Sequence, residues 1–293
     1  MAKFLKKHLT SIILYAVLIF GLCLLLYPTV ADWWNSMHQS RAIASYVEAV
    51  EDLSGEEREA LLEEARRYNR RLALSGIEFQ LTEEQLAEYE SVLDVSGTGI
   101  MGYVQIPKIN VSLPVYHGTD EAVLQIAVGH IAGTSFPIGG EGTHSVLSGH
   151  RGLPSARLFT DLDQILVGDV FTVTVLNETI TYQVDQIRIV EPADVSQLQI
   201  IPGEDHCTLV TCTPYGINTH RMLVRGIRIE DIDETVMVNA DAVQVHPYIV
   251  IPAVVIPIVF VILLGMLVYY RLKKPPKTNE ALLENIKEVA DEE

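Results

Sequence analysis

The chain has 293 residues, a formal net charge of −17 at pH 7 and three cysteines, Cys23, Cys207 and Cys212. Residues 31–247 contain 13 basic and 32 acidic side chains, a balance of −19, which excludes a surface built to neutralise nucleic-acid phosphates. Three cysteines are too few for a disulfide-stapled domain. No cysteine or histidine pair has zinc-finger spacing, so neither a metal nor a cofactor is expected.

Two long stretches without charged side chains are expected to cross a membrane. Residues 9–31 and 248–270 span 23 positions each, and as helices each would be about 34 Å long, enough for a bilayer core. Basic residues precede the first stretch and follow the second: Lys3, Lys6, Lys7, Arg271, Lys273, Lys274 and Lys277. Because basic residues favour the cytoplasmic side, we expect a two-pass membrane protein with residues 32–247 outside.

The first stretch has an alternative interpretation as a cleaved signal peptide. Its end, Thr29-Val30-Ala31, offers small residues for cleavage. The apolar run is longer than the usual signal-peptide core of about 7 to 15 residues. This length favours an uncleaved anchor.

Residues 32–97 are expected to form a helical segment outside the membrane. Within residues 36–73, apolar side chains recur at spacings of three and four, the period of an amphipathic helix. Ser54 and Glu57 have capping-box spacing, so a second helix should begin there. Thr82 is the expected N-cap of a third, shorter helix. The segment should end in a Ser-Gly-Thr-Gly linker.

After this linker, β-branched and aromatic runs alternate with turn residues, which is typical of an all-β domain. The expected strands lie at residues 101–107, 110–118, 144–148, 169–176, 179–190, 207–212 and 222–229. Short helices are expected near residues 120–128 and 155–162. Many short strands joined by turns indicate a closed β-barrel or a sandwich.

Cys212 and Arg221 stand at the two ends of a turn that contains Pro214 and Gly216. If the flanking strands pair antiparallel, the two residues face each other on strands about 4.8 Å apart. A cysteine needs a base or a cation nearby to react as a thiolate. Arg221 would donate to an oxyanion, or else form an ordinary salt bridge. Arg225 would lie about 13 Å further along the strand.

Nine histidines compete for the role of acid or base. His150 ends a strand, as Cys212 does, and a glycine-containing loop follows it. His130 follows an expected short helix and His144 lies near Gly142, so each could be an ordinary turn histidine. His220 should face away from the thiol if Arg221 faces it. Residue chemistry alone leaves this choice open.

Three short strings in the chain resemble the motifs of one enzyme family. The His of SGHRG, the Cys of TLVTC and the Arg of THRMLVRG are similar to those of sortases. The longer strings TCTPYGINTHR and HRGLPSARLFTDLD resemble the pilus-assembling class C sortases. The resemblance covers about residues 31–229 and the three motifs occur in the family's order.

The resemblance implies an eight-stranded sortase barrel and a catalytic set of His150, Cys212 and Arg221. It implies a cysteine transpeptidase that cleaves Leu-Pro-x-Thr-Gly sorting signals between Thr and Gly and joins the Thr carbonyl to a lysine amine of another pilin subunit. The partners would be pilin subunits and the membrane, with no nucleic acid. The catalytic domain would lie on the extracellular face of a Gram-positive cell membrane.

The expected organisation follows from these features in chain order. It comprises a cytoplasmic N-terminus at 1–8, a transmembrane anchor at 9–31, a helical segment at 32–97, a catalytic β-barrel at 98–235, a linker at 236–247, a second transmembrane helix at 248–270 and a cytoplasmic tail at 271–293.

Three other functions fit parts of the sequence. A papain-like protease would place its cysteine before its histidine, the reverse of the order here. A housekeeping sortase would attach surface proteins to cell-wall peptidoglycan. A membrane-anchored binding module could keep the sortase barrel without catalysis, but it would have no need of an activated thiol at Cys212.

Two further residues or segments carry their own expectations. Cys207 is expected to be a small core residue, with a resolving thiol as the alternative. Class C sortases resemble one another in a lid, usually an Asp-Pro-aromatic tripeptide, that covers the active site. Residues 75–81 lack Asp-Pro but offer an acid and a ring, Glu78 and Phe79. A plain helix-to-helix turn is the alternative.

Overall fold

The computed structural model describes residues 2–229 and positions 259, 262 and 265. The predicted linker at 236–247, the second transmembrane helix at 248–270 and the tail at 271–293 lie outside the described residues, those three positions excepted. The chain divides into two units, residues 1–237 and residues 238–293. All of the structure described below belongs to the N-terminal unit.

The first helix, α1 (Ala2–Glu51), is one uninterrupted helix of 50 residues. From Ile13 onward it is long and apolar enough to cross a membrane. The predicted anchor at 9–31 and the predicted helix from residue 36 onward are therefore a single element. Pro28 lies inside α1 without ending it.

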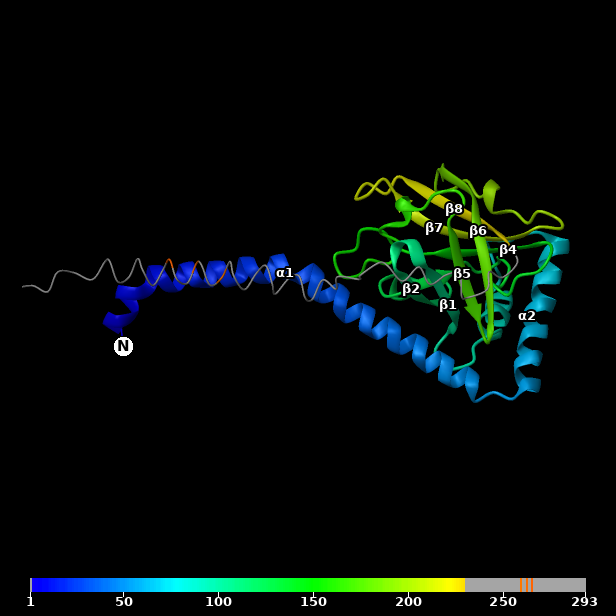
Figure 1. The fold of residues 1–293 in the computed structure, drawn as a ribbon, viewed down its shortest axis with the longest axis horizontal. Coiled ribbons are helices and arrows are strands. Elements are labelled where there is room, and N and C mark those ends of the chain that lie inside the picture. Colours follow the sequence, from blue (N-terminus) through cyan, green and yellow to red (C-terminus); the bar gives the residue numbers. More distant parts are fainter. Residues whose placement is uncertain (1, 230–258, 260–261, 263–264, 266–293) are drawn as a thin grey trace, which may run out of the picture. The chain divides into compact units, whose positions relative to one another are not determined.

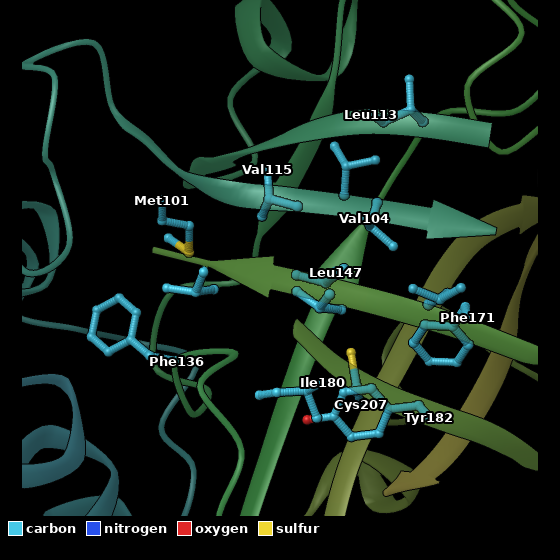
Figure 2. Close-up of a cluster of buried hydrophobic side chains, with 14 of the residues drawn as sticks. Met101, Val104, Leu113, Val115, Phe136, Leu147, Phe171, Ile180, Tyr182 and Cys207 are labelled. Carbon is cyan, nitrogen blue, oxygen red and sulfur yellow. The ribbon is translucent and has the colours of Figure 1, made fainter. Parts of the chain in front are cut away.

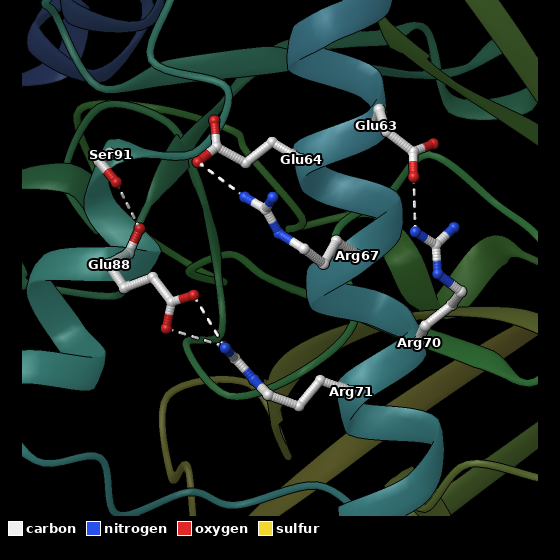
Figure 3. A network of polar contacts seen from close by, with 7 residues as sticks. All are labelled: Glu63, Glu64, Arg67, Arg70, Arg71, Glu88 and Ser91. Atoms are coloured by element: carbon white, nitrogen blue, oxygen red, sulfur yellow. Dashed lines mark hydrogen bonds and ion pairs between the residues drawn. The ribbon is translucent and has the colours of Figure 1, made fainter.

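Two capped helices follow α1, as the sequence predicts. The helix α2 (Gly55–Ser75) begins with the Ser54–Glu57 capping box, and α3 (Glu83–Ser91) begins with Thr82 as its N-cap. Figure 3 shows ion pairs on these helices, including Arg71 of α2 with Glu88 of α3 at 2.8 Å. Such exposed pairs contribute about 0 to 1 kcal/mol each, so packing against the barrel holds these helices.

Eight strands close into the barrel that the resemblance implies (Figure 1). They are β1 (Ile100–Ile106), β2 (Val111–His117), β3 (Val128–His130), β4 (Thr143–Ser148), β5 (Val170–Val175), β6 (Glu178–Val190), β7 (Asp205–Thr213) and β8 (His220–Arg228). Their order around the barrel is β1-β2-β3-β4-β7-β8-β6-β5. Seven of them match predicted strands.

The remaining strand, β3, was not predicted, because it has only three residues and follows a helical pattern. That pattern forms α4 (Glu121–Leu124), shorter than expected. The predicted helix at 155–162 is replaced by turns and the short 3-10 helix η2 (Leu162–Gln164). Further 3-10 turns are η1 (Pro107–Ile109) and η3 (Ser196–Leu198).

The barrel interior and the helical segment share one hydrophobic core, part of which is shown in Figure 2. On the helical side, the side-chain amide of Asn69 in α2 hydrogen-bonds the backbone of Phe136 in both directions, at 3.0 and 2.7 Å. Tyr46 of α1 is buried, and its hydroxyl donates to Met101 O and accepts from Leu176 N. The helices are therefore an integral part of the barrel's packing.

Candidate active site

Three neighbouring strands bring the candidate residues to one end of the barrel. The antiparallel pair β7–β8 places Cys212 directly opposite Arg221. The parallel pair β4–β7 aligns Ser148 with Val210, and just beyond the end of β4 the Gly149 amide donates to Val210 O. Adjacent strands lie about 4.8 Å apart. The strand β7, which carries Cys212, therefore lies between β4, which leads to His150, and β8, which carries Arg221.

Alternation along β7 gives its two cysteines different environments. Cys207 is 0 % exposed inside the barrel core (Figure 2), and burial raises the pKa of its thiol. Cys212, five residues later, points to the other face and is half-buried. The prediction that Cys207 is a small core residue is confirmed. Cys212 is the thiol of β7 that a substrate can reach.

His150 lies just beyond the end of β4, with 27 % of its side chain exposed. Its Nε2 is 3.8 Å from a carboxylate oxygen of Glu121. Its loop is fixed through the backbone, because Gly149 N donates to Val210 O at 3.0 Å and the Thr211 hydroxyl donates to Gly149 O at 2.8 Å. Thr211, whose side chain is buried on the face of β7 opposite to that of Cys212, therefore supports the backbone beside His150.

The position of the Phe159 ring explains why a glycine precedes His150. A Cβ at position 149 would lie 2.7 Å from the Phe159 ring, closer than carbon atoms can approach. The Phe159 amide in turn donates to His150 O at 3.1 Å. Phe159 thus packs under the turn and holds the histidine's own peptide unit.

Arg221 has the contacts expected of an anion-binding arginine. Its Nη1 donates to the carbonyl oxygens of Asn218 and His220 at 3.2 and 3.1 Å. Within residues 2–229 it forms no ion pair, whereas Arg225 is paired with Asp185. The alternative that Arg221 is a salt-bridge residue is therefore not supported by the structure. Its backbone contacts orient a cation beside Cys212 and leave further donors for an oxyanion.

The competing histidines have structural partners elsewhere. His130 is fully buried, 3.0 Å from the Tyr89 hydroxyl, and burial lowers its pKa to about 3. His144 is buried and lies 2.7 Å from the Thr208 hydroxyl, and burial lowers its pKa to about 4. Neither holds a proton near neutral pH or reaches the solvent beside Cys212.

His220 is exposed, with its ring 2.9 Å from the Thr219 hydroxyl. The register places it opposite Thr213, on the strand face that Cys212 does not share. His150 is thus the histidine whose position and exposure suit proton transfer at Cys212.

A small apolar cluster that was not predicted lies on the face of β7 that carries Cys212. Its buried members come from β4, β7, β8 and η3: Val146, Val210, Leu223 and Leu198. Val210 is two residues from Cys212 and therefore shares its face. The period-two pattern of β7 could have predicted that Val210 shares a face with Cys212. No local pattern could have predicted that Leu198 belongs to the same cluster.

The structure shows residues 75–81 as a connection between α2 and α3. Gly76 ends α2 with a positive φ of 86°. The backbone oxygen of Glu78 lies against Gly133, where an added Cβ would be 1.8 Å away. Phe79 is 36 % exposed, and within the described residues Glu78 forms no ion pair with Arg221. A covering role for this segment is therefore a matter for proposal.

Within the described residues, no group of three histidine, cysteine or acidic side chains is arranged to hold a metal ion. The candidate residues themselves offer a thiol, an imidazole and a guanidinium. These three groups suit nucleophilic attack on a carbonyl, with proton transfer and oxyanion stabilisation.

Comparison with known proteins agrees with this geometry. Residues 104–229 match the sortase domain family. The crystal structure of sortase C1 from Streptococcus agalactiae is 54 % identical, with a TM-score of 0.64, over 66 % of this chain and 100 % of that chain. Sortase C from Clostridium perfringens SM101 is 40 % identical, with a TM-score of 0.56, over 65 % of this chain and 99 % of that chain.

Curated relatives match over a shorter region. Sortase D of Bacillus subtilis (strain 168) is 30 % identical over 131 residues, which are 44 % of this chain and 63 % of that protein. Sortase A of Streptococcus agalactiae is 29 % identical over 39 % of this chain and 47 % of that protein. The chain thus spans between about half and two thirds of the length of these two relatives. Together with the barrel and the solved class C structures, these matches show that the chain belongs to the sortase family.

Proposed function

We propose that this protein is a cysteine transpeptidase with Cys212 as nucleophile, His150 as acid and base, and Arg221 as oxyanion donor. The observation that carries the proposal is the strand register, which pairs Cys212 with Arg221, and β4, the strand before His150, is the other neighbour of β7. A cation beside the thiol stabilises its thiolate form.

The reaction follows from these three groups. The Cys212 thiolate attacks the threonine carbonyl of a Leu-Pro-x-Thr-Gly signal, and Arg221 stabilises the resulting oxyanion. The Thr–Gly bond then breaks, the glycine amine takes a proton from His150, and a thioester remains on Cys212. An acceptor amine attacks the thioester, gives a proton to His150 and releases the thiolate.

We propose a lysine of another pilin subunit as the acceptor, so that the enzyme polymerises pili. The supporting observations are the identity to sortase C structures over nearly the whole of those chains and the helical segment that packs on the barrel. We also propose that residues 9–31 and 248–270 anchor the protein in a Gram-positive cell membrane with the barrel outside. The apolar length of α1 supports the first span.

Trapping the acyl-enzyme tests the transpeptidase proposal. The purified protein is incubated with a Leu-Pro-x-Thr-Gly peptide, and the adduct is located by mass spectrometry. We expect an acyl group on Cys212, none in Cys212→Ala, and retained acylation in Cys207→Ala. An adduct elsewhere, or equal loss in both folded variants, contradicts the assignment.

Competition between amines tests the acceptor. The acyl-enzyme is offered a pilin fragment with one reactive lysine, the same fragment with that lysine changed to arginine, and a glycine peptide that represents cell-wall cross-bridges. A pilin polymerase transfers to the lysine fragment alone. Preferential transfer to the glycine peptide would instead support a housekeeping sortase.

We propose further that Glu78 and Phe79 restrict access to Cys212 as an atypical lid. The Asp-Pro pair usual in class C sortases is absent, so the segment should be less rigid than a proline-containing lid. A small thiol reagent should then label Cys212 faster in Glu78→Ala and Phe79→Ala, at unchanged thermal stability. Equal labelling rates in all three proteins would show that residues 75–81 only connect two helices.

A further inference from the structure

One face of α1 packs along the barrel from the end of the apolar stretch onward. Asp32, Asn35 and Gln39 are half-buried, whereas Trp33 and Trp34 between them are exposed. Spacings of three and four place the half-buried residues on one helix face. The same face continues into the core with Ala42, Tyr46 and Val50.

The first two of these polar residues contact the loop that follows His150. The Asp32 carboxylate accepts a hydrogen bond from Arg157 N at 2.8 Å, and the Asn35 amide donates to Ser155 O at 2.8 Å. Gln39, one turn further along, donates to Ile126 O at 2.7 Å and so contacts a different loop. Both contacts of Asp32 and Asn35 are to backbone groups, which makes them specific to the path of the loop.

Short backbone connections link these contacts to His150. Thr160 N donates to Arg157 O at 2.7 Å, and Phe159 N donates to His150 O at 3.1 Å. The Thr160 hydroxyl also accepts from Gly152 N at 3.0 Å. The loop from residue 150 to residue 160 is therefore closed by its own hydrogen bonds, which connect the backbone at Arg157 to the backbone of His150.

The position of Asp32 in the chain gives this contact its significance. The charge-free stretch ends at Ala31, and the exposed Trp33 and Trp34 follow at 46 % and 56 % exposure, where tryptophans commonly lie at a membrane–water interface. Asp32 is thus the first charged residue beyond the proposed span, in the same uninterrupted helix. The proposed anchor and the contacts with the loop after His150 therefore belong to one continuous helix.

We propose that Asp32 and Asn35 are positioning residues, through which the anchor helix sets the geometry of the catalytic histidine. This inference rests on the proposed function of His150. Neither residue touches the substrate. Thr211 of β7 contacts the residue before His150, and Asp32 and Asn35 of α1 contact the loop after it, so that His150 is fixed from both segments of chain that flank it.

Steady-state kinetics of the full chain in phospholipid nanodiscs test this role. The variants are Asp32→Ala, Asn35→Ala and the double variant, with Gln39→Ala as the matched control, because it removes a similar hydrogen bond from the same helix. A displacement of about 1 Å can lower a rate by about 100-fold. We expect the double variant to lose about 10-fold or more in kcat for acyl-enzyme formation, with little change in KM, and Gln39→Ala to stay close to the wild type.

A conservative variant and hydrogen exchange separate positioning from stability. Asn at position 32 still offers an acceptor oxygen to Arg157 N, so Asp32→Asn should recover most of the kcat. Backbone amides of residues 150–160 should exchange faster in the double variant, at an unchanged unfolding temperature. Unchanged kcat in the double variant, beside a wild type that acylates Cys212, overturns this inference alone. A wild type that never acylates Cys212 overturns the proposed function as well.

Discussion

Removing the hydroxyl of Thr211 is expected to lower the rate of catalysis, although this hydroxyl does not contact the substrate. It is 2 % exposed and donates to the buried carbonyl of Gly149, which precedes His150. Thr211→Val keeps the shape of the side chain and removes only this donor. Thr211→Ser keeps the donor and removes one buried methyl group.

Both variants should therefore lose stability, but only Thr211→Val should also lose activity. Leaving the Gly149 carbonyl without its partner costs about 1 to 3 kcal/mol, whereas losing a buried methyl costs about 0.8 kcal/mol. If the first cost appears in the transition state through a displaced His150, Thr211→Val loses about 5- to 150-fold in rate, at about 1.4 kcal/mol per factor of ten. Thr211→Ser should stay close to the wild-type rate.

Single-turnover acylation of Cys212 measures the rates, and thermal unfolding measures the stabilities. Each kcal/mol should lower the unfolding temperature by about 2 to 4 °C in a domain of this size. Equal acylation rates in Thr211→Val and Thr211→Ser would refute the reasoning, because the hydroxyl would then have no role in placing His150.

Three further predictions follow from the described contacts. Arg221→Lys should be severely impaired in acylation because an ammonium cannot reproduce the guanidinium fork, whereas Arg225→Lys should matter much less; similar losses in both variants would contradict the role of Arg221. The pKa values of about 3 for His130 and about 4 for His144 lie below the ordinary 6.5, so the unfolded state binds more protons between pH 6.5 and pH 4. The free energy of unfolding should then decrease as the pH is lowered through this window, by about 2 kcal/mol per histidine at pH 5. Denaturant melts that coincide at pH 7 and pH 5 would contradict this. Tyr46→Phe removes a hydroxyl that satisfies two buried backbone groups, so unfolding should show a loss of about 1 to 3 kcal/mol, and wild-type stability would exclude a role for these bonds.

Local pattern predicted most of the secondary structure. Seven strands, the Ser54–Glu57 capping box, the Thr82 N-cap and the turn between Cys212 and Arg221 follow from residue spacing and turn chemistry. The antiparallel pairing of β7 with β8 could also be predicted, because a short turn joins them. Cys212 opposite Arg221 was therefore available from the residues alone.

The placement of His150 could not be predicted in the same way. β4 and β7 are neighbours through a parallel pairing across more than fifty residues of intervening chain, and no local pattern specifies such a partner. Residue chemistry left His130, His144 and His220 as alternatives, and only the resemblance selected His150. The structure gives physical reasons against these alternatives, because His130 and His144 are buried and His220 lies on the strand face that Cys212 does not share.

The contacts of α1 were also beyond the reach of the sequence pattern. Asp32 and Asn35 are ordinary polar residues at the end of an apolar stretch, where solvent exposure is the default expectation. Their partners are backbone groups more than a hundred residues away, and backbone atoms leave no signature in a sequence.

These differences have a common physical cause in how the three site residues are held. Cys212 and Arg221 lie within β7 and β8, so the ladder of hydrogen bonds between the strands fixes them. His150 lies two residues beyond the end of β4, outside any ladder. Its geometry therefore depends on single contacts from Thr211, Phe159 and the Arg157 region. Substitutions in these contacts should alter proton transfer more than thiol reactivity, so a reagent that alkylates Cys212 directly should distinguish them from substitutions of Arg221.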